Sequence, residues 1–266
     1  MSPSVTGSGV LLRHTRRGLW LLVCAAALLL AGCATAPGAH PRDPWEPLNR
    51  DVHAFNETFD RVAFKPVAVA YKTVTPRLVR AGVTNFFNNL GDTWSLANNI
   101  LQGKLQASVE TYFRLTVNTI WGIGGVFDIA TEIGVEARTE DLGQTLGLWG
   151  LPTGPYLVLP FFGPSNLRDA LATPADSFGY PVTWVNPVAL RNSLAALNAV
   201  DKRANYLRAG EMLEESALDK YVFSRDVFLQ KRRNDIYDGS PPPEEELPAV
   251  PEAAPRDVPD PTAVKP

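Results

Sequence analysis

Residues 121–129 read WGIGGVFDI, and this glycine-rich run decides how the chain can fold. Three glycines within nine residues do not suit the interior of a helix, so the chain must turn here. Residues 105–121, which lead into the run, carry apolar side chains at helical spacing. Residues 131–144, which follow it, are polar and contain Gly134 and Gly143 near their two ends. We therefore expect a helix, a tight turn and a hairpin-like loop, in that order.

The glycine-rich run belongs to a long stretch that is poor in charge. Of the 51 residues from 81 to 131, only five are charged, namely Asp92, Lys104, Glu110, Arg114 and Asp128. Such a stretch either forms the core of a domain or faces lipid. Its apolar pieces are separated by glycines and are too short to cross a bilayer, which favours helices that lie within one leaflet.

The rest of the folded part also has helical periodicity. Along residues 48–62, apolar side chains recur at steps of four and three residues, at Leu48, Val52, Phe55, Phe59 and Val62. We expect Pro66 and Pro76 to divide the helices that follow. Further helices are expected over residues 78–90, 93–102, 187–207 and 218–237.

The helix expected over residues 218–237 is amphipathic. Its predicted inward-facing residues are Leu218, Tyr221, Val222, Phe228 and Leu229. No segment alternates clearly between apolar and polar residues, as a half-buried strand would. The expected fold class is therefore mainly α, built from short amphipathic helices that are broken at glycine and proline.

The N-terminus has the pattern of a lipoprotein signal peptide. Three arginines precede an apolar run of 13 residues, 18–30, which is too short to span a bilayer. The lipobox LAGC follows at residues 30–33, so we expect residues 1–32 to be removed and Cys33 to be acylated. An ordinary signal peptide with a chance cysteine is the alternative. Because Ala34 rather than aspartate comes next, we expect a lipid anchor on the periplasmic side of the outer membrane of a diderm bacterium.

Composition divides the remaining chain into three parts. Residues 33–42 form an acylated tether, and residues 43–239 form the folded helical domain. Residues 240–266 contain nine prolines and six acidic against two basic residues. This composition cannot bury enough apolar surface to order a chain, so we expect a disordered tail.

Charge and residue types exclude several classes of function. After removal of the first 32 residues, 22 basic residues face 28 acidic ones, a net charge of −6 that argues against nucleic-acid binding. Both cysteines are accounted for by the signal peptide and the anchor, and no histidine spacing fits a metal site. Ser165 lies in no nucleophile motif, and Glu132 and Glu136 sit in polar surroundings. We expect no catalytic residue, no metal and no cofactor, and hence not an enzyme.

Taken together, these segments resemble the MlaA (VacJ) family of outer-membrane lipoproteins. The resemblance rests on the lipobox, on DPxExxNR at 43–50, on Phe55-Asn56, on PVAVA at 66–70, on Asn85-Phe86 and on LQG at 101–103. It continues through NTIWG at 118–122, Gly124-Gly125, GPY at 154–156, LPF at 159–161 and LRD at 167–169. The matching motifs cover nearly all of the folded part in order, and the proline-rich tail lies outside them.

The resemblance implies a ring of helices that lies in the inner leaflet of the outer membrane, with an amphipathic central channel controlled by a hairpin loop. It implies a passive, gated route by which mislocalised phospholipids leave the outer leaflet, which keeps the membrane asymmetric. It also implies two protein partners, a trimeric outer-membrane porin and a soluble periplasmic lipid carrier that serves an inner-membrane ABC transporter.

The predicted hairpin loop falls within residues 131–146. We hypothesise that its apolar residues set the channel gate, namely Ile133, Val135, Leu142 and Leu146. Two other functions remain open. The first is a structural lipoprotein that braces porins or the cell envelope, and the second is a periplasmic enzyme that acts on lipid or peptidoglycan.

Overall fold

The computed structural model describes residues 40–243. The chain divides into two compact units, and the fold below is that of the unit Pro47–Glu246. The predicted signal peptide, the acylation site Cys33 and most of the predicted tether and tail lie outside the described residues.

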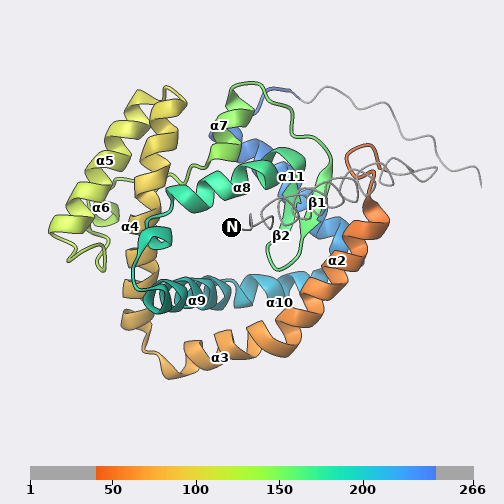
Figure 1. The fold of residues 1–266 in the computed structure, drawn as a ribbon, viewed down its shortest axis with the longest axis horizontal. Coiled ribbons are helices and arrows are strands. Elements are labelled where there is room, and N and C mark those ends of the chain that lie inside the picture. The colour runs from red at the N-terminus through yellow and green to blue at the C-terminus, as the bar shows by residue number, and fades with distance from the viewer. Residues whose placement is uncertain (1–39, 244–266) are drawn as a thin grey trace, which may run out of the picture. The chain divides into compact units, whose positions relative to one another are not determined.

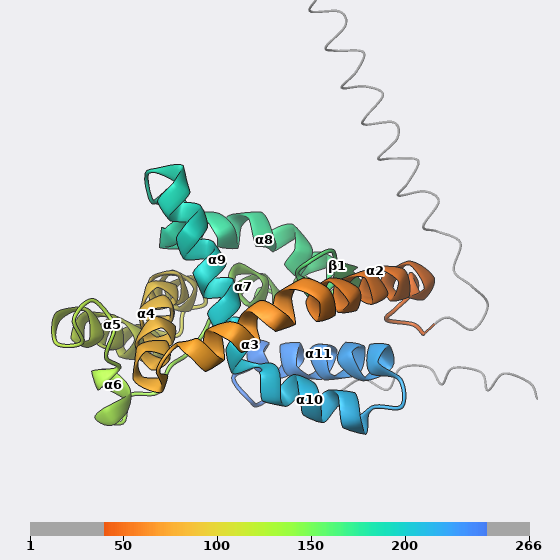
Figure 2. The ribbon, with the colours of Figure 1, turned by 90° about the horizontal axis from the view of Figure 1, so that it is seen from below.

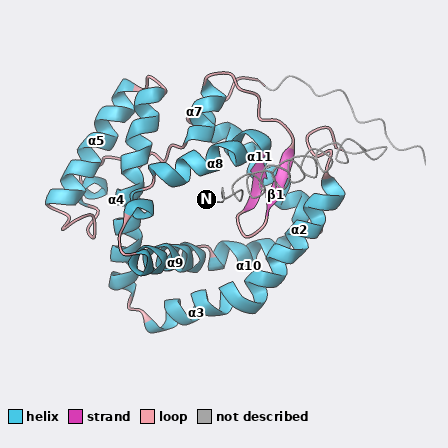
Figure 3. Ribbon diagram, in the orientation of Figure 1, coloured by secondary structure: helices cyan, strands magenta, loops and turns pink. Residues whose placement is uncertain are grey.

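The described fold is mainly α, which confirms the expected fold class (Figure 3). Helix α2 (Glu46–Phe59) continues through a π-helical turn, η1 (Asp60–Phe64), into α3 (Lys65–Val74). Helices α4 (Arg77–Leu101) and α5 (Leu105–Ile120) form a long hairpin, followed by α6 (Ile129–Glu132) and α7 (Leu142–Leu148). The antiparallel strands β1 (Tyr156–Leu159) and β2 (Gly163–Asn166) come next. The chain then forms α8 (Leu167–Gly179), the 3-10 turn η2 (Pro181–Trp184), α9 (Val188–Asn205), α10 (Leu207–Ser216) and α11 (Lys220–Ile236).

Within this unit the helices are arranged as a ring (Figure 1). The continuous α2–α3 segment makes one side, α4 makes the next, and α8 and the strands make the side opposite α3. Helix α9 is seen nearly end-on in Figure 1 and along its length in Figure 2, so it crosses the plane of the ring. Among the described helices, none is both long enough and apolar enough to cross a membrane.

The glycine-rich run 121–129 turns the chain back against α4, as its sequence predicts. Gly125 adopts a φ of +90°, and a Cβ built on it would lie 2.5 Å from the Cβ of Asn89 on α4. Only glycine combines this backbone conformation with so close an approach. The amide of the same Asn89 donates a hydrogen bond of 3.1 Å to Thr119 Oγ1 on α5, so the turn closes over a polar contact between α4 and α5.

The interior of the described unit is unusually polar. The contact between α4 and α5 buries Asn89, Asp92, Ser95, Asn98 and Asn99 from α4 and Ser108, Thr111, Arg114 and Asn118 from α5. Apolar clusters are small, such as Ala68, Ala204 and Leu207 in one and Tyr156, Val158 and Tyr221 in another. Soluble domains normally bury apolar side chains and expose charged ones. The contact between α4 and α5 is therefore as polar as an ordinary protein surface.

The exposed surface of α4, α5 and the turn that follows is correspondingly apolar. Leu78 on α4 is 86% exposed and Leu105 on α5 is 80% exposed. Other exposed apolar residues of these elements include Val79, Val109, Tyr112, Phe113, Ile120, Trp121, Ile123 and Phe127. The charge-poor stretch 81–131 therefore buries only a few of its apolar side chains, Phe87, Ala107, Val117 and Ala130, and exposes most of the large ones. So much exposed apolar surface is a feature of proteins that contact lipid or a partner.

Two expectations about helix boundaries are wrong. Pro66 does not divide two helices, because it lies in the first turn of α3, where its missing N–H is tolerated, and η1 joins α2 to α3 without a break. Residues 78–90 and 93–102 belong to one helix, α4, of 25 residues. The helix expected over about 187–207 is confirmed as α9, which ends at Asn205, and α10 starts two residues later.

Three further features differ from the sequence analysis. Strands β1 and β2 were not expected, because four residues each are too few to show an alternating pattern. Helix α8 was not assigned either, although Asn166 caps it by accepting a hydrogen bond from Asp169 N. Leu218 is fully exposed rather than inward-facing, because it precedes Asp219, the residue that caps α11. Tyr221, Val222, Phe228 and Leu229 do pack together as expected.

Candidate functional site: a cavity on the inner side of the ring

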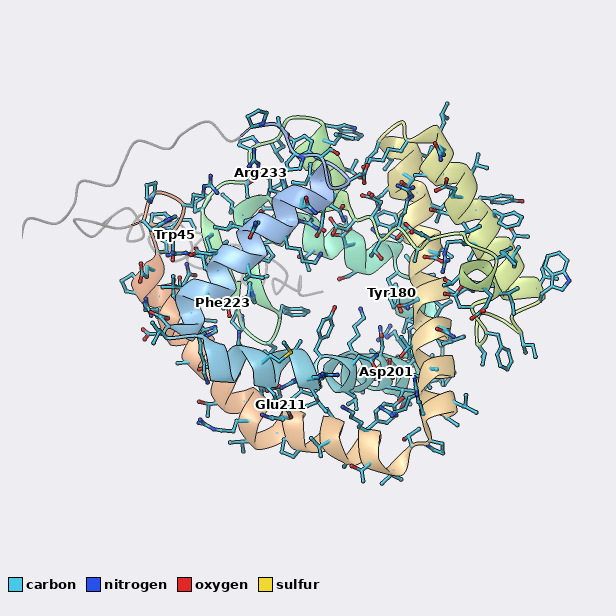
Figure 4. The ribbon with its side chains drawn as sticks, turned by 180° about the vertical axis from the view of Figure 1, so that it is seen from behind. Trp45, Tyr180, Asp201, Glu211, Phe223 and Arg233 are labelled. Carbon is cyan, nitrogen blue, oxygen red and sulfur yellow. The ribbon has the colours of Figure 1, made fainter. Side chains whose placement is uncertain are left out.

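A cavity of about 760 Å³ lies between α4, α8, η2 and α9, and residues 139–141 close one side of it. Its lining mixes apolar groups, such as Trp94, Phe162 and Val182, with hydroxyls, amides, carboxylates and two cations. Figure 4 places Tyr180, one of the lining residues, on the inner side of α4. A cavity with both kinds of lining can accept a molecule that is itself part polar and part apolar.

The wall between α4 and α8 is held by Trp94 and Asp176. The indole Nε1 of Trp94 donates to Asp176 Oδ1 over 2.8 Å, and the backbone N–H of Leu142 donates to the same oxygen over 2.8 Å. Burial raises the pKa of Asp176 above its ordinary value, and these two donors oppose that rise. Gly179, at the end of α8, lets the Trp94 ring lie directly against its backbone. The wall is therefore fixed by directional contacts as well as by packing.

The other two carboxylates of the cavity are also held by neighbouring groups. Arg232 of α11 binds Asp141 through two hydrogen bonds of 2.5 and 2.6 Å. Burial would raise the pKa of Asp141, but the hydrogen bonds from Arg232 hold it below its ordinary value. Glu140 accepts hydrogen bonds from Gln102 at 2.8 Å and from Lys104 at 3.2 Å, while burial raises its pKa.

Helix α9 presents one face to the cavity. Arg191, Ala195, Asn198 and Lys202 all line the cavity and follow one another at steps of four, three and four residues. Asn198 Nδ2 donates to the Tyr180 hydroxyl over 3.2 Å, and this hydroxyl donates to the carbonyl of Phe87 over 3.3 Å. Burial raises the pKa of Tyr180 to about 12, so it stays a neutral donor. This face was missed in the sequence analysis, although its spacing is visible in the sequence.

The predicted hairpin segment is attached to α5 and to the turn before it. Arg114 donates to the carbonyl of Val135 and, over 3.0 Å, to Thr131 Oγ1. The same guanidinium binds Asp128 through hydrogen bonds of 3.0 and 3.1 Å. Further along, Arg138 Nε donates to Glu110 Oε2 of α5 over 3.1 Å. The segment from α6 to Arg138 is therefore fastened at two points to the α4–α5 hairpin.

The four apolar residues proposed for the gate lie in different surroundings. Ile133 is exposed, Val135 is half-buried, and Leu142 and Leu146 are half-buried on α7. The described cavity is lined by Thr139, Glu140 and Asp141 of this segment and by none of those four residues. Their role as a gate stays a prediction.

The other residues considered in the sequence analysis make structural contacts. Arg168 Nε donates to Asp169 Oδ1 over 3.0 Å, and both side chains are buried at the start of α8. Ser165 is buried in β2, and its hydroxyl donates to the carbonyl of Asn166 over 3.4 Å. Within residues 40–243, no three His, Cys, Asp or Glu side chains are grouped as a metal site would need.

Comparison with known proteins places the chain among lipid-transport lipoproteins. The sequence model of the MlaA lipoprotein family matches residues 41–235. The chain is 35% identical to the intermembrane phospholipid transport system lipoprotein MlaA of Escherichia coli K12, over 76% of this chain and 82% of that protein. It is 30% identical to the protein of the same name from Haemophilus influenzae, over 82% of this chain and 90% of that protein.

A solved structure has the same fold. It comes from work on the structural basis for maintenance of bacterial outer membrane lipid asymmetry. The two structures superpose with a TM-score of 0.64 at 28% sequence identity, over 73% of this chain and 98% of the other. The match therefore extends over nearly the whole length of the other chain.

Proposed function

Because the chain belongs to the MlaA lipoprotein family, we propose that it removes phospholipid from the outer leaflet of the outer membrane and so keeps that membrane asymmetric. The protein acts without chemical catalysis, as a passive and gated path. Polar headgroups follow the polar groups that line the cavity between α4, α8 and α9, while acyl chains stay against apolar surfaces.

The observation that carries this proposal is the inverted burial of the ring. Asn89, Asp92 and Arg114 are buried where α4 packs against α5, while Leu78 and Leu105 are almost fully exposed. A helix in hydrocarbon keeps apolar side chains towards the lipid and needs polar partners for every polar group it buries. The same arrangement supports a ring that rests within one leaflet, since none of the described helices is suited to crossing the bilayer.

The anchor and the partners complete the proposal. Cys33 carries the lipid anchor, which places the ring on the periplasmic side of the outer membrane. Lipid that leaves the ring passes to a soluble periplasmic carrier, and a trimeric porin holds the ring in place. These three statements rest on the lipobox and on the family resemblance.

The test is the phospholipid content of the outer leaflet in cells without the gene, measured with a reagent that cannot cross the outer membrane. We expect the content to rise on deletion and to return to normal with the wild-type gene. Ala195→Trp, which fills the cavity from α9, is expected to fail to restore it. Ala196→Trp is the matched control, because Ala196 is exposed on the next position of α9 and does not line this cavity.

Two results would refute the proposal. The first is an unchanged outer leaflet on deletion. The second is full complementation by Ala195→Trp, which would favour a structural lipoprotein that braces the envelope without a path through it. Membrane abundance of both variants must equal that of the wild type, because a variant that fails to accumulate would also fail to complement.

A further inference from the structure

Helix α9 is placed so that a molecule passing through the ring would travel along it. Figure 1 looks down the ring and sees α9 nearly end-on, whereas Figure 2 sees the helix rise across the ring plane. Residues that share one face of α9 are therefore spread along the axis of the ring. The face that lines the cavity carries Arg191 at one end and Lys202 at the other.

The two cations are too far apart on the helix to act as one clamp. They are separated by eleven residues, which is three turns, so they point the same way and their backbones are about 16 Å apart. Ala195, Asn198 and Ala199 lie between them on the cavity lining. This is a track of small and neutral side chains with one cation at each end.

The two cations of the cavity, Arg191 and Lys202, are not paired with its three carboxylates, Glu140, Asp141 and Asp176. Within the described residues, Arg191 and Lys202 make no ion pair and no side-chain hydrogen bond. The carboxylates on the opposite side are already occupied, since Asp141 binds Arg232, Glu140 binds Lys104 and Gln102, and Asp176 accepts from Trp94. An anion that entered the cavity could therefore accept hydrogen bonds from Arg191 and Lys202 without displacing a carboxylate from either cation.

We propose that Arg191 and Lys202 bind the phosphodiester of a glycerophospholipid at two successive positions along α9. The inference rests on the proposed function, since it names the chemistry by which this cavity recognises the transported lipid. Guanidinium and ammonium groups both form charge-assisted hydrogen bonds with phosphate oxygens. The apolar lining groups Trp94, Phe162 and Val182 offer surface for the glycerol and the start of the acyl chains.

A binding experiment tests the phosphate contact directly. The full acylated protein in detergent is titrated, by native mass spectrometry, with dioleoyl phosphatidylglycerol, with dioleoylglycerol, which lacks phosphate, and with glycerol 3-phosphate, which lacks chains. We expect phosphatidylglycerol to bind best. Arg191→Met and Lys202→Met each weaken that binding about tenfold, while binding of dioleoylglycerol stays unchanged. Lys202→Arg retains most of the affinity.

The control for these variants is Lys72→Met on α3, which removes an exposed cation that does not line the cavity. It is expected to bind all three probes as the wild type does. The proposal is overturned if the double variant binds phosphatidylglycerol as tightly as the wild type, or if dioleoylglycerol binds equally well. Equal binding of glycerol 3-phosphate would also overturn it, because the site would then recognise a free phosphate.

A second measurement in cells separates this inference from the proposed function. If Ala195→Trp fails to restore the outer leaflet but the double methionine variant restores it fully, the lipid path stands and the cation track is wrong. If deletion of the gene leaves the outer leaflet unchanged, the proposed function is wrong, and the inference about Arg191 and Lys202, which rests on it, is wrong as well. We expect neither Ala195→Trp nor the double methionine variant to restore the outer leaflet, and we expect Lys72→Met to restore it.

Discussion

Asp92 Oδ2 lies 3.7 Å from Nε of Arg114, and neither atom makes a hydrogen bond to a described residue. The other two nitrogens of this guanidinium are committed to Asp128, Thr131 and the carbonyl of Val135. Arg114 thus holds the turn and the predicted hairpin in place. Asp92 stays buried next to this charged group, but its Oδ2 accepts no hydrogen bond from a described residue. Burial raises the pKa of Asp92 to about 6, although the charge of Arg114 acts to lower it.

This arrangement predicts that Asp92→Asn stabilises the protein at high pH only. Because the pKa of Asp92 is higher in the folded protein than its ordinary value of 3.8, the folded state holds this proton more tightly. The contribution of Asp92 to stability is therefore greatest below pH 4 and falls as the pH rises through 6. We expect a gain of about 2 kcal/mol at pH 8 and little change at pH 4. Thermal unfolding of the wild type and the variant in detergent, at pH 4 and at pH 8, measures this gain. An equal shift in melting temperature at the two pH values would show that ionisation of Asp92 does not destabilise the fold.

Arg232→Met is predicted to be strongly destabilising. Arg232 is mostly buried and pairs with both Asp141 and Asp169 at 2.6 Å or less. Its loss leaves the partly buried Asp141 without a cation and leaves the buried Asp169 with Arg168 alone. We expect a loss of about 3 kcal/mol or more. The neighbouring Lys231→Met is the control, because the Lys231–Asp235 pair involves a side chain that is 72% exposed. Its loss is expected to change stability by less than about 1 kcal/mol. Equal melting temperatures for the two variants would refute this view of Arg232.

Gly125→Ala is predicted to disturb the packing of the turn against α4. The φ of +90° and the contact of 2.5 Å with Asn89 Cβ add backbone strain to a steric clash. Gly124→Ala is the matched control, because Gly124 has a φ of +68° but nothing within 4 Å of its added Cβ. We expect about 1 kcal/mol for the control, from strain alone, and a clearly larger loss for Gly125→Ala. If the two losses were the same, the close approach to Asn89 would be irrelevant.

The gate hypothesis predicts that fastening the hairpin segment to α5 stops transport. Glu110 and Arg138 are 3.1 Å apart at their charged ends, so Glu110→Cys and Arg138→Cys can be joined by a short bismaleimide. We expect outer-leaflet phospholipid to rise when the linker is added to cells with both cysteines. Cells with either cysteine alone, treated in the same way, should keep a normal outer leaflet. Unimpaired transport by the joined protein would show that this segment does not need to move.

The sequence was sufficient for most of the helices and for the turn, because their signals are local. The glycine run 121–129 and the helical spacing over 105–121 need no distant residue to be interpreted. Boundaries were less predictable. From the sequence alone Pro66 is expected to break a helix, but the π-helical turn η1 joins α2 to α3 without a break. The two expected halves of α4 form one helix through Gly91, where an added Cβ would meet no other atom within 4 Å.

The cavity could not be predicted, because it is assembled from segments far apart in the chain. Trp94 and Asp176 are 82 positions apart, and Asp141 and Arg232 are 91 positions apart. Periodicity gives the two faces of a helix but not which one points inward. In this protein that choice is reversed relative to a soluble domain, so the apolar face of α5 lies outside.

The inverted burial also determines which positions can drift during evolution. Lipid contacts are non-directional, so Leu105, Val109 and Ile120 can exchange among apolar types with little effect, provided that they remain apolar. Hydrogen bonds between α4, α5 and the turn that follows depend on direction and length, so Asn89, Asn118 and Arg114 tolerate almost no replacement. Over long divergence, relatives should therefore keep the identities of their interior residues and only the hydropathy of their exterior ones, a pattern of constraint opposite in chemistry to that of a soluble globule.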